Sequence, residues 1–305
     1  MKKKGIALVE RQYLFPFVLI TSLFFLWGFA HAILDVLNKH FQELLTITRT
    51  HSAMIQATMY MGYFIMAIPA GLFINRHGYR KGVVLGLLLY GIGSLLFIPG
   101  QYIASFNMFL FSLFVIGCGL TFLETAANPY VTELGARETA ASRLNFAQSF
   151  NGLGCIFAPI LTGLLLFSDE EKGTSGNVAL PYAVMGVIVL LAALAFMRVR
   201  LPEIPHEEEV DSEGHRVGLW AHKLFVFGLV ALFAYEVSEI SINSFFINYV
   251  TEVGWMNARD ASLVLSFGGL GLFMVGRFVG SWIMRRVRAE KMLFWCATGT
   301  VITTL

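Results

Sequence analysis

Long apolar runs recur along almost the whole chain, and they restrict its fold more than any other feature. A helix needs about 20 mostly apolar residues to cross a bilayer, and most of these runs approach or exceed that length. They lack the period-2 alternation of strands, and backbone groups in lipid must be paired within the protein, which favours helices. The runs cover residues 13–34, 52–74, 83–99, 108–127, 144–167, 182–197, 224–250 and 261–284.

Composition supports the same conclusion. The chain is 56% hydrophobic and 14% charged, whereas about a quarter of the residues of a soluble domain are charged. We therefore predict an all-α polytopic membrane protein, in which glycines within the runs, such as Gly62 and Gly86, permit close helix approach. The first run follows a Lys-rich start, but it is too long for a secretory signal and lacks a small-residue cleavage site, so we expect a retained helix.

The basic residues indicate an orientation. If the N-terminus is cytoplasmic, most of the 22 Lys and Arg residues fall in cytoplasmic loops, as the positive-inside rule requires. The net charge of +2 therefore reflects topology, and no nucleic-acid partner is expected.

A polar, Pro-containing stretch divides the chain, because such composition is typical of a linker. We predict an N-terminal six-helix transmembrane bundle at 1–198, a cytoplasmic linker at 199–219 and a partial C-terminal bundle of about two and a half helices at 220–305. The sequence stops inside an apolar segment, so we expect a truncated form of a longer protein or the product of a damaged gene. The alternative is a natural short terminal helix.

A weak repeat relates the two parts. The segment "GLFINRHGYRK" starts at Gly71 and "GSWIMRRVRAEK" at Gly280, each after the second apolar run of its part. Parallel six-helix halves joined by a long linker are the architecture of major facilitator transporters.

Glu124 and Asn128 interrupt an apolar run one helical turn apart, on one face. A charged side chain at bilayer depth costs about 2.5–3.5 kcal/mol on insertion scales, so it faces a cavity or a partner. The functional interpretation is a carboxylate that lines a water-filled pathway. The alternative is a Glu that pairs with a buried donor and holds helices together.

A second polar stripe follows the first run. Trp27, His31, Asp35 and Asn38 are spaced four, four and three residues apart, along one helix face. The stripe predicts that Asp35 also borders a cavity. Alternatively, Asp35 lies at the outer end of the helix and is simply solvated.

Further stripes have the same character. They are Gln56, Tyr60 and Tyr63; Asn145, Gln148 and Asn151; and Glu236, Glu239 and Asn243. Amides can donate to and accept from sugar hydroxyls, and aromatic faces pack on apolar C–H groups, so these residues favour a sugar cavity. The alternative is hydrogen bonding between helices, which is worth less than about 2 kcal/mol per pair.

The short basic loop with Arg76, Arg80 and Lys81 has two interpretations. It is either a gating loop that pairs with helix ends in one conformation, or a topology signal only. No nucleophile elbow, P-loop or metal-binding motif occurs, and the three cysteines form no ligand pattern, so we predict neither an enzyme nor a metal site.

Four segments together resemble the fucose–galactose–glucose:proton symporter family of the major facilitator superfamily. They are "SLFFLWGFAHAILDVLNKHF", "MGYFIMAIPAG", "LETAANPYV" and "RLNFAQSFNGLG". The resemblance implies the major facilitator fold with twelve helices, here a six-helix N-terminal bundle plus an incomplete C-terminal bundle. It also implies a bacterial inner (plasma) membrane protein, which we expect to be a monomer in the lipid bilayer.

The resemblance also implies roles for single residues. Asp35 and Glu124 match the family's two acids of proton coupling, and Glu124 also lines the sugar cavity. Gln148 and Asn151 match its sugar-binding polar pair, and Trp27 flanks the site. In "YEVSEISINSF", Glu239 matches a position that is Glu in the glucose/galactose type.

Two departures bear on the substrate: the pair His31–Ala32 replaces an Asn-rich pair of fucose permeases, and Glu236 is an additional acid. We predict import of a monosaccharide, of the glucose/galactose or fucose class, with a proton by alternating access. Burial favours the neutral form of Glu124, which can donate to a sugar as well as accept. No cofactor is expected. Sodium-coupled or uncoupled sugar transport, drug export and a non-transporting remnant stay open as alternatives.

Overall fold

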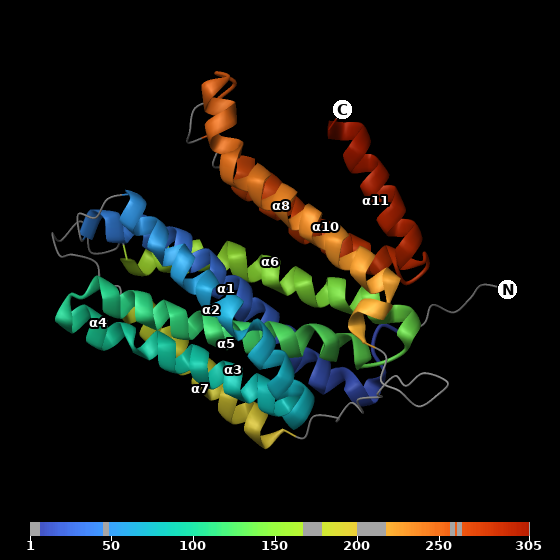
Figure 1. Cartoon of the computed structure of the whole chain (residues 1–305), viewed down its shortest axis with the longest axis horizontal. Coiled ribbons are helices and arrows are strands. Elements are labelled where there is room, and N and C mark those ends of the chain that lie inside the picture. The colour runs from blue at the N-terminus through green and yellow to red at the C-terminus, as the bar shows by residue number, and fades with distance from the viewer. Residues whose placement is uncertain are drawn as a thin grey trace. The chain divides into compact units, whose positions relative to one another are not determined.

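The computed structural model describes residues 7–44, 49–166, 179–199, 218–256, 260 and 264–304. Within these, the side chains of residues 35–44, 49–53, 159–166, 219, 265, 266 and 270, and of several residues in 240–248, lie outside the description. All elements of the described part are helices, as predicted. They are α1 (Leu14–Leu44), α2 (Arg49–His77), α3 (Tyr79–Leu95), α4 (Phe97–Ile103), α5 (Phe106–Glu133), α6 (Ala140–Leu166), α7 (Ala179–Arg198), α8 (Lys223–Glu252), α10 (Gly271–Ile283) and α11 (Ala289–Thr304) (Figure 1).

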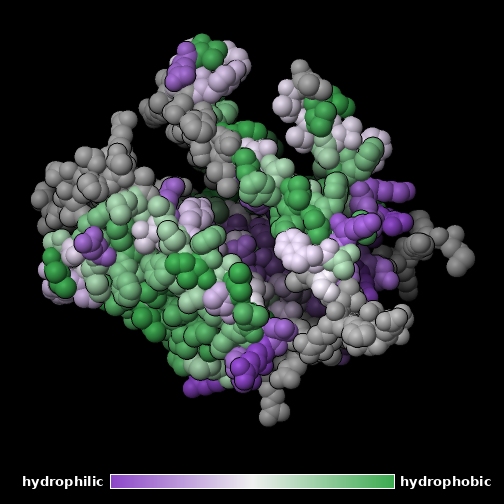
Figure 2. Space-filling model, in the orientation of Figure 1, coloured by the Kyte–Doolittle hydropathy of each residue, from purple (hydrophilic) through white to green (hydrophobic). Residues whose placement is uncertain are grey.

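Five stretches of the described residues are long and apolar enough to cross a membrane. They are Arg11–Leu34, Met54–His77, Tyr79–Ile103, Phe106–Glu133 and Ala179–Arg198. Figure 2 shows apolar side chains covering much of the face around α3, α4 and α7. Large apolar side chains exposed on α7 include Val187, Ile188 and Leu191. Such a surface is suited to lipid rather than water.

The chain divides into two compact units, Met1–Ile204 with Met274–Leu305, and Pro205–Phe273. In the first unit, α1 packs along α6, α5 packs along both α2 and α3, and α3 packs along α7 (Figure 1). The second unit contains α8 and a π-helical segment, Val264–Leu270. The predicted boundaries at residues 198 and 219 stay predictions.

Local sequence explains where several helices end. Gly78 has a positive φ of 86° between α2 and α3, a conformation that glycine adopts without strain. Ala104 is left-handed after α4, and Ser105 then caps α5 by accepting from the backbone N–H of Met108 at 3.4 Å. The predicted run at 83–99 is therefore a longer span, made of α3 and α4.

Glycines set the distance between the packed helices. A Cβ atom added at Gly62 of α2 would lie 2.8 Å from the carbonyl oxygen of Phe114 on α5. One added at Gly28 of α1 would clash with the carbonyl oxygen of Asn151 on α6. Backbones that approach this closely leave no room for a side chain, which is how helices associate tightly in membranes.

We predict that Gly62→Ala destabilises the bundle, by roughly 1–3 kcal/mol, because the new methyl group overpacks the α2–α5 contact. Thermal unfolding of the purified protein in detergent measures this effect. Gly71→Ala is the matched control on the same helix, since a Cβ there meets nothing within 4 Å. Equal unfolding temperatures for the two variants would contradict the proposed packing.

Arg143, near the start of α6, is completely buried. Its guanidinium donates to the carbonyl oxygens of Leu8, Val131, Thr132 and Ala136 and to the hydroxyl of Thr139. Val131 and Thr132 belong to the last turn of α5, where carbonyl groups lack partners within the helix. Arg143 therefore joins the end of α5 to the start of α6.

We predict that Arg143→Lys lowers the free energy of unfolding by about 2 kcal/mol or more, because an ammonium group cannot reproduce the fork of donors. Arg137→Lys is the control, since Arg137 is exposed in the short 3₁₀ helix just before α6. Thermal unfolding compares the two variants. A stable Arg143→Lys protein would show that the carbonyl contacts contribute little.

The last part of α10 is tied to α6 within the first unit. The Ser142 hydroxyl donates to the carbonyl oxygen of Ser281, and the Ser281 hydroxyl donates to that of Ser142 at 2.8 Å. Both serines are buried. About one turn from each serine, the ring centroids of Phe278 on α10 and Phe146 on α6 lie 5.7 Å apart, edge to face. The contact between α10 and α6 therefore consists of a serine pair on one turn and a phenylalanine pair on the neighbouring turn.

Candidate functional site

The predicted stripe on α1 is partly described. Trp27 and His31 are half-buried on α1, and their ring centroids lie 5.9 Å apart. The helix continues through Asp35 and Asn38 to Leu44, so Asp35 does not lie at the end of the helix. The side chains of Asp35 and Asn38 lie outside the described residues.

Tyr63 of α2 joins the two α1 side chains. Its hydroxyl lies 2.9 Å from the indole Nε1 of Trp27 and 3.0 Å from Nε2 of His31. The ring of Tyr60, one turn earlier, lies 6.2 Å from the His31 ring and is itself exposed. The predicted binding residue Gln56 is exposed on the same helix. Of the α2 stripe, Tyr63 is the member whose hydroxyl is described within hydrogen-bond distance of two α1 side chains.

Glu124 of α5 is half-buried opposite this group. It lines a small cavity of about 10 Å³ together with Trp27, Phe24 and Ala127. That space is close to what a single water molecule requires. Glu124 is also within electrostatic reach of Tyr63. The carboxyl group thus lies near the aromatic groups of Trp27 on α1 and Tyr63 on α2.

The predicted amides form hydrogen bonds between helices. Nε2 of Gln148 donates to Oδ1 of Asn128 at 3.2 Å, which links α6 to α5. Nδ2 of Asn151 donates to the backbone oxygen of Phe24 at 3.4 Å, which links α6 to α1. Because each amide has two donor hydrogens and an acceptor oxygen, these bonds leave capacity for a ligand.

Arg80 of the basic loop is bonded to α7, and the predicted α8 residues belong to the second unit. Arg80 donates to the carbonyl oxygen of Phe196 at 3.2 Å and to that of Met197, in the last turn of α7. Arg76 and Lys81 are exposed. Glu239, on α8 of the second unit, is half-buried, and the side chain of Asn243 lies outside the described residues.

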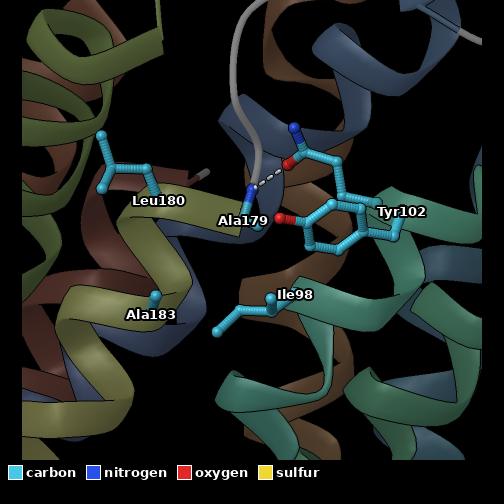
Figure 3. A pocket seen from close by; sticks show the side chains of 6 residues that line it. Ile98, Tyr102, Ala179, Leu180 and Ala183 are labelled. Carbon is cyan, nitrogen blue, oxygen red and sulfur yellow. Dashed lines mark hydrogen bonds between the residues drawn. The ribbon is translucent and has the colours of Figure 1, made fainter.

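A second, larger pocket lies where α4 ends and α7 begins. It has a volume of about 480 Å³ and is lined by Ile98, Tyr102, Leu180 and their neighbours (Figure 3). The backbone N–H of Ala179, the first residue of α7, donates to Oε1 of Gln101 at 2.7 Å. The side-chain amide of Gln101, which lines the pocket, therefore already caps the start of α7. None of the predicted site residues lines this pocket, and most of its lining is apolar.

Comparison with known proteins identifies the family. The family model of the Major Facilitator Superfamily matches residues 17–305. The chain belongs to this superfamily.

Individual major facilitator proteins are close in sequence. The glucose/galactose transporter of Brucella abortus biovar 1 (strain 9-941) is 34% identical over 299 residues, which cover 96% of this chain and 72% of the relative. The L-fucose-proton symporter of Escherichia coli (strain K12) is 34% identical over 309 residues, which cover 93% and 70%. The crystal structure of FucP in the outward conformation superposes with a TM-score of 0.78 at 34% identity, over 93% of this chain and 74% of that one. The predicted major facilitator fold is thereby confirmed.

Within this major facilitator protein, the structure groups Trp27, His31 and Tyr60 with Glu124, and it pairs Asn128 with Gln148. Their roles in transport stay predictions. Tyr63 belonged to a predicted stripe, yet it was not among the predicted binding residues. Its spacing of three from Tyr60 was the available signal, and only the packing of α2 on α1 distinguishes the two tyrosines. Among the described residues, no cluster of three or more His, Cys, Asp or Glu side chains could hold a metal ion.

Proposed function

We propose that this chain imports a monosaccharide of the glucose/galactose or fucose class together with a proton, by alternating access. It would act in the bacterial inner membrane with its N-terminus in the cytoplasm. The relatives named as sugar transporters and symporters support the substrate class. The observation that carries the proposal is a half-buried carboxyl, Glu124, beside an aromatic pair and an amide pair in a membrane bundle.

The chemistry of Glu124 connects proton and sugar. A carboxylate is costly to bury, whereas its neutral form is less so, and the neutral form can donate a hydrogen bond as well as accept one. Proton uptake from the periplasm would therefore prepare Glu124 to bind a sugar hydroxyl. Proton release to the cytoplasm would restore an acceptor-only group and weaken the bound sugar.

The neighbouring side chains fit this task. The cavity beside Glu124 holds about one water molecule, so a sugar would lie outside it, against the polar groups that border it. The remaining donors and acceptors of Asn128, Gln148 and Asn151 would bind hydroxyl groups, and the Trp27 ring would pack on the sugar's C–H face. Asp35 would hold or relay the second charge. Arg80, Arg76 and Lys81 would act as the gating loop.

Uptake into proteoliposomes tests the proposal. Radiolabelled glucose, galactose and fucose are offered in turn, under a pH gradient or under a sodium gradient. Accumulation of one of these sugars under the pH gradient alone is the expected result. Accumulation that needs sodium would replace the proton as the coupling ion, and failure to move any of the three sugars would reject the proposed substrate class.

We predict that Glu124→Gln abolishes uphill accumulation under a pH gradient but retains exchange of labelled for unlabelled sugar. The amide mimics the neutral acid and cannot release a proton, so the sugar can bind without coupling. Glu138→Gln, on the exposed 3₁₀ turn before α6, is the control and should accumulate sugar like the wild type. Full uphill accumulation by Glu124→Gln would exclude Glu124 from coupling.

A further inference from the structure

The hydroxyl of Tyr63 holds two α1 side chains at one point. Trp27 Nε1 lies 2.9 Å away and His31 Nε2 lies 3.0 Å away. Tyr63 comes from α2, so these two bonds connect α2 with successive turns of α1. The residue before it, Gly62, packs directly on the backbone of α5. The position of the hydroxyl is therefore determined by backbone contacts on one side and by two hydrogen bonds on the other.

Donor and acceptor chemistry determines where the protons lie. An indole N–H can only donate, so the Tyr63 oxygen accepts from Trp27. Tyr63 then has one proton to donate, and His31 is its other hydrogen-bond partner among the described residues. Donation of this proton to Nε2 of His31 requires that Nε2 carry no hydrogen. A neutral imidazole with a bare Nε2 carries its proton on Nδ1.

The other protonation states of His31 fit less well. An Nε2–H group, in the other neutral tautomer or in imidazolium, would donate to an oxygen that already accepts from Trp27. The hydroxyl proton of Tyr63 would then have no acceptor among the described residues, which is unfavourable for a group in the protein interior. The titratable groups described around this pair are Glu124 from α5, Tyr60 from α2 and Tyr90 from α3.

We infer that Tyr63 is a positioning residue, which keeps His31 neutral with its proton on Nδ1 and thereby presents a hydrogen-bond donor to the transported sugar. The inference rests on the proposed function and deepens it, since it assigns a specificity-determining donor. Among the described residues, the hydrogen bond of His31 is made by Nε2, so a proton on Nδ1 would be left to donate to a ligand oxygen. Sugar hydroxyl and ring oxygens are suitable acceptors.

The protonation of His31 can be measured without any transport. Imidazole ¹⁵N chemical shifts distinguish a protonated from a bare nitrogen, and the His31→Gln protein identifies the His31 signals in the full chain, labelled at histidine and held in lipid nanodiscs. At neutral pH we expect a protonated Nδ1 and a bare Nε2, and we expect this preference to weaken in Tyr63→Phe. A proton on Nε2 in the wild type, or an unchanged pattern in Tyr63→Phe, would overturn the inference.

Transport kinetics test the consequence for the sugar. Tyr63→Phe removes one oxygen atom, and we expect the KM for the transported sugar to rise about tenfold, with a smaller effect on the maximal rate. His31→Gln should raise the KM as well, and the double variant should be no worse than His31→Gln alone, because the hydroxyl acts through His31. Additive effects, or an unchanged KM in Tyr63→Phe, would contradict this account.

Tyr182→Phe is the matched control. The Tyr182 hydroxyl is buried without a hydrogen-bond partner among the described residues, and its ring stacks on Phe97 at 3.7 Å. Loss of that hydroxyl should leave the KM unchanged. If the wild type moves no monosaccharide, the proposed function fails, and the NMR measurement still decides the protonation of His31.

Discussion

Direct contact between helix backbones is the constraint on which the rest of the first unit depends. Lipid is as apolar as a leucine side chain, so helices in a membrane gain little by hiding apolar surface and associate through close packing instead. Gly86 of α3 and Gly119 of α5 show this best, because a Cβ added at either would lie within 2.8 Å of the other's carbonyl oxygen. The absence of side chains at these points allows the helices to meet.

The candidate site takes its geometry from these contacts. Tyr63 lies within hydrogen-bond distance of Trp27 and His31, and its neighbour Gly62 fits against α5. Asn151 of α6 reaches the Phe24 carbonyl of α1 where Gly28 and Gly154 bring those two helices together. Polar groups that would be costly in lipid are thereby paired with each other and with backbone groups, and the protein keeps a carboxyl group between them.

The sequence predicted the helices, and one face of the site, from periodicity. Apolar runs located the spans, and the four-residue spacing of Glu124 and Asn128 placed both on one face of α5. Periodicity could not show which residues of different helices meet. Three features depend on helix packing. They are the hydrogen bond between Asn128 and Gln148, the hydrogen bond of Tyr63 to Trp27, and the burial of Arg143 against four carbonyl groups. Short backbone features, such as the left-handed Ala104 between α4 and α5, have no periodic signal.

The paired serines of α6 and α10 make hydrogen bonds for which each serine also has a local alternative acceptor in the turn before it. A serine in a helix can return its hydroxyl to the carbonyl four residues earlier, as Ser149 does with Asn145 at 2.9 Å and Ser112 with Met108 at 2.8 Å. If Ser142 and Ser281 moved apart, each hydroxyl could donate to a carbonyl oxygen of the preceding turn instead of to the other serine, and neither hydroxyl would lose its hydrogen bond. The proposed alternating access would require surfaces that separate and rejoin, and a contact whose hydrogen bonds are replaced rather than lost would suit that requirement.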